Sequence, residues 1–222
     1  WDPRMSELVG SDLEIEALLR RELLKAHFAD EDTDIAFTRA VSALRLPDRM
    51  FENAQLPGNS ITLRQRVLAK TDATGGITWD SSTMLVDWLL AGGGEASLFV
   101  DRSVLELGAG AGLLSIVIAR LGAASVTITD GDAAAIDTAL ENAAINDVAD
   151  HVSASVLQWG RGSSSAADSQ MAHALECIGR NGKCAHTIVA SDVLYNEEAI
   201  DLLEETLRAL IGCGGGGHVV LG

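Results

Sequence analysis

The sequence predicts an α/β fold in which a doubly wound, mostly parallel sheet follows an N-terminal extension. Short apolar runs alternate with amphipathic runs from Trp79 onward, and a glycine-rich turn directly follows one of the apolar runs. Strands that alternate with helices are typical of parallel sheets with helices on both faces. The 222 residues suffice for one well-packed core and a small appendage. We expect a helical accessory region over residues 1–58 and the main domain over residues 59–222.

The accessory region is expected to contain two amphipathic helices. The first spans residues 11–28 and begins with a Ser-x-x-Glu capping box. The second runs from residue 33 or 34 up to Pro47, which cannot continue a helix. Residues 60–70 then alternate apolar and polar side chains with a period of two, which predicts a strand in a small hairpin or sheet extension.

The main domain is expected to alternate strands and helices. Its predicted strands span residues 103–107, 125–129, 151–157, 187–191 and 218–221, and its predicted helices span residues 82–90, 113–121, 133–146 and 197–211. The strand runs are short and apolar, whereas the helix runs are longer and amphipathic or richer in alanine and leucine. Glycine and serine are frequent between residues 160 and 182, so we expect an insertion around a short helix there.

The turn after the first strand of the main domain indicates a ligand site. Residues 106–112 read Glu-Leu-Gly-Ala-Gly-Ala-Gly, and a helix is expected directly afterwards. Glycines let the backbone turn sharply and approach a ligand, and the helix N-terminus offers unpaired N–H groups. The third glycine comes one residue earlier than in the dinucleotide fingerprint. With the acidic Glu106 at this lip, the pattern favours a nucleoside with a cationic amino-acid end; a turn without a ligand is the alternative.

An acidic residue ends the next predicted strand. Asp130 lies 22 positions after Gly108. A carboxylate about 20 residues past a glycine-rich turn accepts hydrogen bonds from ribose hydroxyls. This role suits nicotinamide and adenosylmethionine cofactors equally. The alternative is that Asp130 caps the following helix, although Asp132 is better placed to do so.

A second polar group follows the predicted strand over residues 187–191. Asp192 and Tyr195 stand three residues apart, so both could face one site if this segment is helical. A carboxylate would attract a lysine ammonium, and a phenol ring would pack against the lysine stem. The alternative is an aspartate that caps the next helix beside a tyrosine that only packs.

Two tryptophans stand where loops are expected around the same sheet edge. Trp79 precedes the first helix of the main domain, and Trp159 follows the third strand. Either ring could stack on an adenine or cover a methionine tail, or could simply be a core or rim aromatic residue.

The charge and the cysteine pattern of the sequence restrict the expected binding partners and the expected cellular compartment. The formal charge is −16, of which −13 falls on residues 77–222. Such a surface repels nucleic-acid phosphates and attracts a basic or lysine-bearing partner, although acidity can also serve solubility alone. Three cysteines without a Cys-x-x-Cys pattern favour a reducing compartment and argue against a disulfide framework or a zinc site. No apolar run approaches the roughly 20 residues that span a bilayer. We expect a cytoplasmic monomer with no bound metal.

Several of these motifs together resemble a known family. They are the Thr-Gly-Gly-Ile-Thr-Trp-Asp string over residues 74–80, the turn over residues 106–112, Asp130, Trp159 and the Ala-Ser-Asp-Val-Leu-Tyr run over residues 190–195. Together they resemble the seven-beta-strand protein-lysine methyltransferases of the methyltransferase-16 group. The string at 74–80 and the preceding strand over residues 56–63 are most similar to the elongation factor 2 lysine methyltransferase branch.

The resemblance implies a Rossmann-like class I methyltransferase fold that uses S-adenosylmethionine. By position, it implies that the cofactor is lined by Trp79, Gly108, Ala109, Gly110, Asp130, Trp159 and Ala190. It also implies that Asp192 and Tyr195 orient the target lysine, here on a translation elongation factor such as elongation factor 2.

Two features depart from the family pattern. The family often has Asp or Thr where Gln158 precedes Trp159. The family fold also continues beyond its fifth strand with a helix and an antiparallel hairpin, whereas this chain runs from Trp1 to Gly222. We therefore expect the C-terminal strands to be absent and the chain to be a piece of a longer protein.

Three other functions are weighed against protein-lysine methylation. The acidic surface and the Asp192/Tyr195 pair disfavour a small-molecule methyltransferase of the same fold. The glycine spacing and Glu106 disfavour a nicotinamide-dependent oxidoreductase. The presence of both Asp192 and Tyr195 disfavours a non-catalytic, adenosylmethionine-binding interaction protein.

Overall fold

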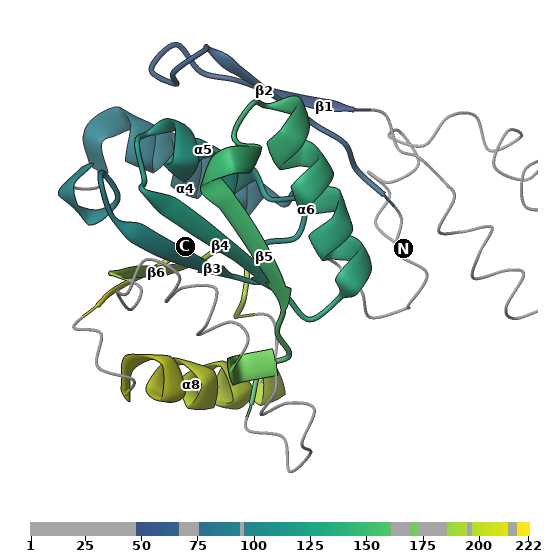
Figure 1. Ribbon diagram of the computed structural model, residues 1–222, viewed down its shortest axis with the longest axis vertical. Coiled ribbons are helices and arrows are strands. Elements are labelled where there is room, and N and C mark those ends of the chain that lie inside the picture. Colours follow the sequence, from purple (N-terminus) through teal and green to yellow (C-terminus); the bar gives the residue numbers. More distant parts are fainter. Residues whose placement is uncertain are drawn as a thin grey trace, which may run out of the picture.

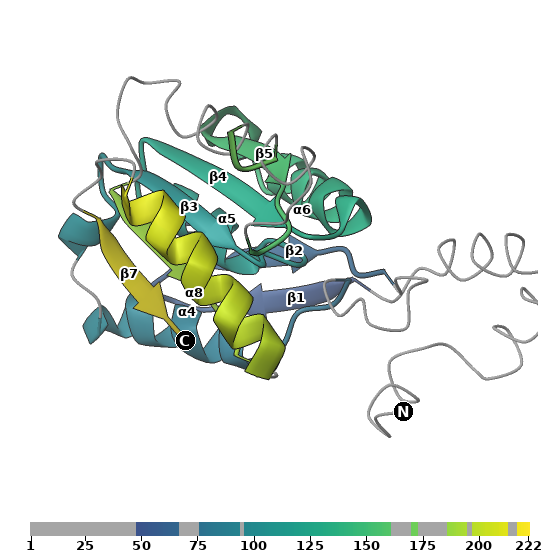
Figure 2. The same ribbon diagram turned by 90° about the horizontal axis from the view of Figure 1, so that it is seen from below.

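The computed structural model describes residues 48–66, 76–93, 96–160, 170–172, 186–194, 197–212 and 217–222. The two predicted N-terminal helices, Tyr195 and the three cysteines lie outside these ranges, as does most of the predicted insertion, of which residues 170–172 are helical. Within the described residues, the main sheet has five strands in the order β5-β4-β3-β6-β7, and every neighbouring pair is parallel. Figure 1 labels the first four of these strands, and Figure 2 labels β7. The predicted α/β fold with a mostly parallel sheet is confirmed.

The strand and helix limits lie close to the predicted ones. The strands are β3 (Ser103–Leu107), β4 (Ser125–Asp130), β5 (Val152–Val156), β6 (Thr187–Ala190) and β7 (His218–Leu221), and the helices are α4 (Asp80–Trp88), α5 (Leu113–Arg120), α6 (Ala133–Ile145) and α8 (Glu197–Gly212). Each limit is within two residues of its prediction. The main domain also contains a π-helical turn (Leu89–Gly93) and short 3₁₀ helices (Ala96–Leu98 and Ala149–His151).

Helices cover both faces of the sheet. Alternate residues of β3 show this, because successive side chains of a strand point to opposite faces. Val104 belongs to a buried cluster with α4 and α5, whereas Leu105 and Leu107 cluster with Leu203 and Leu210 of α8. Figures 1 and 2 show α4, α5 and α6 on one face and α8 on the other. Within the described residues, no helix combines the length and the apolar character that a bilayer crossing requires.

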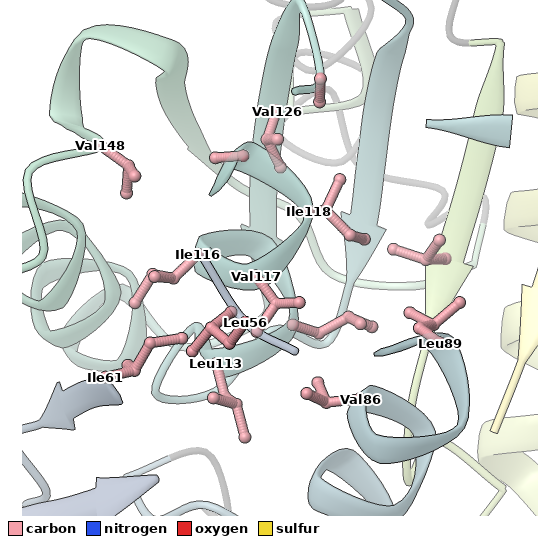
Figure 3. Packing of buried hydrophobic residues seen from close by; sticks show 14 of the residues in the cluster. Leu56, Ile61, Val86, Leu89, Leu113, Ile116, Val117, Ile118, Val126 and Val148 are labelled. Atoms are coloured by element: carbon pink, nitrogen blue, oxygen red, sulfur yellow. The ribbon is translucent and has the colours of Figure 1, made fainter. Parts of the chain in front are cut away.

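Helix α5 lies at the centre of the larger core. Residues 113–119 of this helix are all buried, as expected for a helix that is apolar on nearly every side. The sheet contributes Val126 to the same cluster, α4 contributes Val86, and the N-terminal hairpin contributes Ile61 (Figure 3). The helix is therefore enclosed by three different parts of the chain.

The enclosing hairpin consists of β1 (Arg49–Glu52) and β2 (Ser60–Leu63), which pair antiparallel. The hairpin agrees with the predicted sheet extension, but β1 was not predicted, and the predicted strand over residues 60–70 ends at Leu63. The predicted boundary between residues 58 and 59 falls in its turn. Arg120 of α5 holds this turn, since its guanidinium donates hydrogen bonds to the carbonyls of Pro57 at 3.2 Å and Ser60 at 2.6 Å.

Candidate functional site

The strand order places a topological switch point at the glycine turn. Strand β3 has β4 on one side and β6 on the other, so the chain leaves β3 and β6 in different directions at their carboxyl ends. Ligands of open α/β sheets bind outside the carboxyl ends of the strands at such a point. The predicted residues Gly108, Asp130 and Asp192 follow or end three neighbouring strands, β3, β4 and β6, at this edge.

The spacing of the three glycines has a backbone explanation. Gly108, Gly110 and Gly112 have φ angles of +66°, +54° and +84°, which L side chains rarely adopt. A Cβ at Gly108 would lie 3.1 Å from Cγ1 of Val193 and 3.2 Å from Cζ2 of Trp159. The Trp159 ring thus reaches past β4 from the end of β5 and covers the start of the turn. The ring also packs against the buried cluster of Leu105, Leu107, Leu203 and Leu210, the α8-side cluster, so part of its role is packing.

The third glycine is required by helix packing as well. A Cβ at Gly112 would lie 3.1 Å from the Cβ of Ala139 in α6. Ala109, between the first two glycines, is 9% exposed and packs with Ile128, Ile136 and Ala139. The turn is therefore pressed against α6 on one side and against Trp159 and Val193 on the other.

Asp130 is bonded directly to the turn. Its carboxylate accepts hydrogen bonds from the backbone N–H of Gly110 at 3.0 Å and of Asp132 at 2.9 Å. Burial raises the pKa of Asp130, and these backbone hydrogen bonds oppose the rise. Asp132 caps α6, because its side chain accepts from the N–H of Ala134 at 2.8 Å. The capping alternative for Asp130 is thus wrong.

Glu106 lies beneath the turn rather than at an exposed lip. Its side chain is 1% exposed and points to the α5 side of the sheet, where it accepts a hydrogen bond from the hydroxyl of Ser115. Burial raises the pKa of Glu106 to about 8, against the opposing effect of the Ser115 hydrogen bonds. The expected position at the lip is therefore wrong. Strand alternation explains the difference, because Glu106 shares the inward orientation of Val104.

Asp192 is exposed at the carboxyl end of β6 and has a φ of +58°. Its N–H donates a hydrogen bond to the carbonyl of Gly222 at 3.1 Å, and the N–H of Gly222 donates to the carbonyl of Ala190 at 3.0 Å. Residues 191–194 are not helical, and α8 begins only at Glu197, so Asp192 does not cap that helix. Tyr195 lies outside the described residues, so its place beside Asp192 stays a prediction.

The remaining predicted residues occupy two different environments. Trp79 directly precedes α4 and is 37% exposed, whereas Ala190 is fully buried in the α8-side cluster. A link between α4 and the residue after β6 was not predicted: the hydroxyls of Ser82 and Ser191 lie 2.7 Å apart. This bond fixes the start of α4, and with it the Trp79 segment, beside the end of β6.

The residues around the turn fit the adenosyl part of a cofactor. A carboxylate has about four lone-pair sites, so Asp130 can accept from ribose hydroxyls while it holds the turn. The Trp79 ring is exposed enough to cover a ligand. The part of the chain that the structure describes holds no group of three or more His, Cys, Asp or Glu side chains that could bind a metal ion.

Comparison with known proteins gives a family. A model of the lysine methyltransferase family matches residues 57–220. The chain is 27% identical over 169 residues to the human protein-lysine N-methyltransferase EEF2KMT, a match that covers 70% of this chain and 46% of the relative. It is 29% identical over 157 residues to the protein-lysine N-methyltransferase EFM3 of Chaetomium thermophilum, covering 67% of this chain and 42% of the relative. The chain thus spans less than half the length of these relatives.

A solved structure shares this architecture. The fold is similar to that of a SAM-dependent methyltransferase from Agrobacterium tumefaciens, with a TM-score of 0.51 and 16% sequence identity over 78% of this chain and 51% of that chain. At this identity the likeness shows the fold alone.

Proposed function

Because the chain belongs to the lysine methyltransferase family, whose model matches residues 57–220, we propose that it is the catalytic part of an S-adenosylmethionine-dependent protein-lysine N-methyltransferase. The observation that carries the proposal is the position of the exposed Asp192 carboxylate at the sheet edge that also carries the glycine turn and Asp130. A cofactor site and a group able to attract an ammonium therefore stand at the same edge.

Each residue at this edge has a separate role in binding the cofactor. Asp130 accepts the ribose hydroxyls, the turn over residues 108–112 allows the close approach of the ligand, and Trp79 covers it. Trp159 supports the turn at Gly108. When bound, adenosylmethionine supplies a methyl group that its sulfonium makes electrophilic.

Asp192 attracts and orients the target lysine. A free lysine ammonium has a pKa of about 10.4, so its proton has to leave to water or to a carboxylate before the nitrogen can attack. Most of the acceleration comes from holding the nitrogen in line with the methyl group and the leaving sulfur, because positioning alone can supply several kcal/mol. The family resemblance assigns Tyr195 to the same task.

The substrate that we propose is an elongation factor 2-like translation factor. Support comes from the similarity to EEF2KMT and EFM3 and from the strings at residues 56–63 and 74–80. The charge of −13 on residues 77–222 suits a basic, lysine-bearing partner and disfavours direct nucleic-acid binding. We further propose that the protein acts as a monomer in the cytoplasm, in line with its cysteine pattern.

The test is transfer of a tritiated methyl group. The chain is incubated with labelled adenosylmethionine and a cell lysate, and the labelled band is compared with purified elongation factor 2. The expected result is label on this protein, recovered as methyl-lysine after hydrolysis. Label on another protein would overturn the proposed substrate, and label only on small metabolites would indicate a small-molecule methyltransferase.

A further inference from the structure

A single buried amide joins the N-terminal hairpin to the glycine turn. Asn142 of α6 is fully buried, and its Nδ2 donates hydrogen bonds to the carbonyls of Arg64 at 3.0 Å and Ala111 at 2.8 Å. Its Oδ1 accepts from the N–H of Arg64 at 2.8 Å. Both amide hydrogens are thus used, and the two kinds of partner fix which end of the amide is which.

The partner on the hairpin is the residue at which β2 stops. Strand β2 ends at Leu63, which pairs with the first residue of β1, so Arg64 has no strand partner in this hairpin. Asn142 satisfies the N–H and the carbonyl of Arg64 together, as a neighbouring strand would. Buried backbone groups left without partners are costly, so this contact anchors the hairpin to α6.

The partner on the other side is part of the ligand turn. Ala111 lies between Gly110 and Gly112, the residues that adopt φ angles of +54° and +84°. Its carbonyl is held by Asn142, while the N–H of Gly110 is held by Asp130. Ala139, one turn earlier on α6, contacts the same segment at Gly112. The orientation of this part of the turn therefore depends on one polar contact from the end of β4 and one from α6.

A second asparagine provides a natural comparison. Asn146 stands four residues after Asn142, directly after the last residue of α6, and holds the hairpin in the same manner. Its Oδ1 accepts from the N–H of Thr62 at 3.1 Å and its Nδ2 donates to the carbonyl of Thr62 at 2.8 Å. Its other Nδ2 bond goes to the backbone carbonyl of Asn142. Asn146 thus anchors the hairpin through hydrogen bonds that do not involve the glycine turn.

We propose that Asn142 is a positioning residue for the cofactor turn and that it couples the turn to the N-terminal hairpin. The cofactor part of this inference rests on the proposed function; the coupling itself does not. The amide holds the peptide between Ala111 and Gly112 in the orientation that ligand binding uses. Loss of the amide frees two neighbouring glycines, so the turn samples other conformations and the affinity for the cofactor falls.

The test compares Asn142→Ala with Asn146→Ala. Asn142→Ala leaves the N–H and the carbonyl of Arg64 without the asparagine side chain, and Asn146→Ala does the same at Thr62. Only Asn142→Ala also releases the carbonyl of Ala111. Two quantities are measured: amide hydrogen exchange at residues 110–112 without ligand, and the Kd of S-adenosylhomocysteine by calorimetry. Should Asn142→Ala not fold, the pair Asn142→Ser and Asn146→Ser replaces it, since serine keeps one donor at each site.

The expected result is selective for Asn142. Exchange at residues 110–112 should rise about tenfold and the Kd should increase about tenfold, a ratio that corresponds to about 1.4 kcal/mol. Asn146→Ala should lower the melting temperature without either change. Equal exchange at the turn in the two variants would overturn the coupling. If the wild type does not bind S-adenosylhomocysteine, the proposed function fails, while the exchange measurement still decides the coupling.

Discussion

The carboxylate of Asp130 and the backbone N–H of Gly110 are joined by a hydrogen bond of 3.0 Å. This contact links the carboxyl end of β4 to the turn that follows β3. It gives Asp130 a structural role in addition to the ribose contact that we propose. A substitution at Asp130 should therefore disturb the ligand site in two ways, through the turn and through the lost acceptor.

The first prediction concerns Asp130→Asn. The amide keeps only one acceptor oxygen, so it cannot accept from Gly110 and Asp132 as the two carboxylate oxygens do. Hydrogen bonds to charged groups are worth about 1.5–3 kcal/mol, so the Kd of S-adenosylhomocysteine should rise about tenfold to a hundredfold. Asp132→Asn is the control, since asparagine caps a helix as well as aspartate does. An equal Kd in wild type and Asp130→Asn would contradict the assignment.

The second prediction concerns the start of the turn. Gly108→Ala introduces a Cβ at a φ of +66° and within 3.2 Å of both Val193 and Trp159. We expect a loss of about 2–3 kcal/mol in the free energy of unfolding, because backbone strain and crowding act together. Gly92→Ala is the matched control, with a φ of +81° but no atom within 4 Å of the new Cβ. It should lose only about 1 kcal/mol. Similar losses in the two variants, measured by urea unfolding, would show that the contacts at Gly108 do not matter.

The third prediction is a pH dependence caused by Glu106. Its pKa is raised from 4.5 to about 8 in the folded protein, so between these values the folded state keeps a proton that the unfolded state has lost. Its stabilising contribution is complete below pH 4.5 and declines as the pH rises to about 8. The loss is at most about 1.4 kcal/mol for each pH unit.

Glu106→Gln tests this dependence. The neutral amide does not titrate and can still accept from the Ser115 hydroxyl. The free energy of unfolding of this variant should therefore fall less steeply than that of the wild type across the interval from pH 4.5 to 8. Because Asp130 also has a raised pKa, some slope will persist in the variant. Identical slopes for the two proteins would refute a buried, protonated Glu106.

The fourth prediction separates substrate binding from cofactor binding. Asp192→Asn removes the charge but tolerates the φ of +58°, because asparagine adopts this conformation readily. We expect methyl transfer to protein to fall by at least about tenfold, since the ammonium loses its partner, while S-adenosylhomocysteine binds as before. Asp147→Asn is the control, as Asp147 is also exposed and has a φ of +60° beyond α6. If both variants keep full transfer activity, Asp192 does not orient the lysine.

The fold could be predicted from the sequence where local patterns and tertiary packing agree. Strands β3 and β7 have the predicted limits, because each is a short apolar run bounded by polar residues or glycine. Strand β1 was not predicted, because its four residues include the charged Arg49 and Glu52. Only Phe51 of this strand is buried, and the other three side chains are partly or fully exposed. Its formation depends on pairing with β2 and on packing over α5. No local pattern in residues 49–52 reports these distant contacts.

The site could be predicted only in part, for a related reason. The glycine spacing and the strand-end positions of Asp130 and Asp192 follow from chain order, so the sequence places them at one edge. The contacts of Trp159 with the turn and of Asn142 with Ala111 join residues 51 and 31 positions apart, respectively, and carry no periodic signal. The spacing of Glu106 from the glycines does not give the direction of its side chain, which strand alternation turns to the α5 side of the sheet.

The most direct test of the account is the choice of ligand at the glycine turn. Wild-type chain is titrated by calorimetry with S-adenosylhomocysteine and, separately, with NADH under the same conditions. The account predicts one site for S-adenosylhomocysteine and at least about tenfold weaker binding of NADH, because the spacing of the third glycine departs from the dinucleotide pattern. Tighter binding of NADH would contradict the methyltransferase assignment.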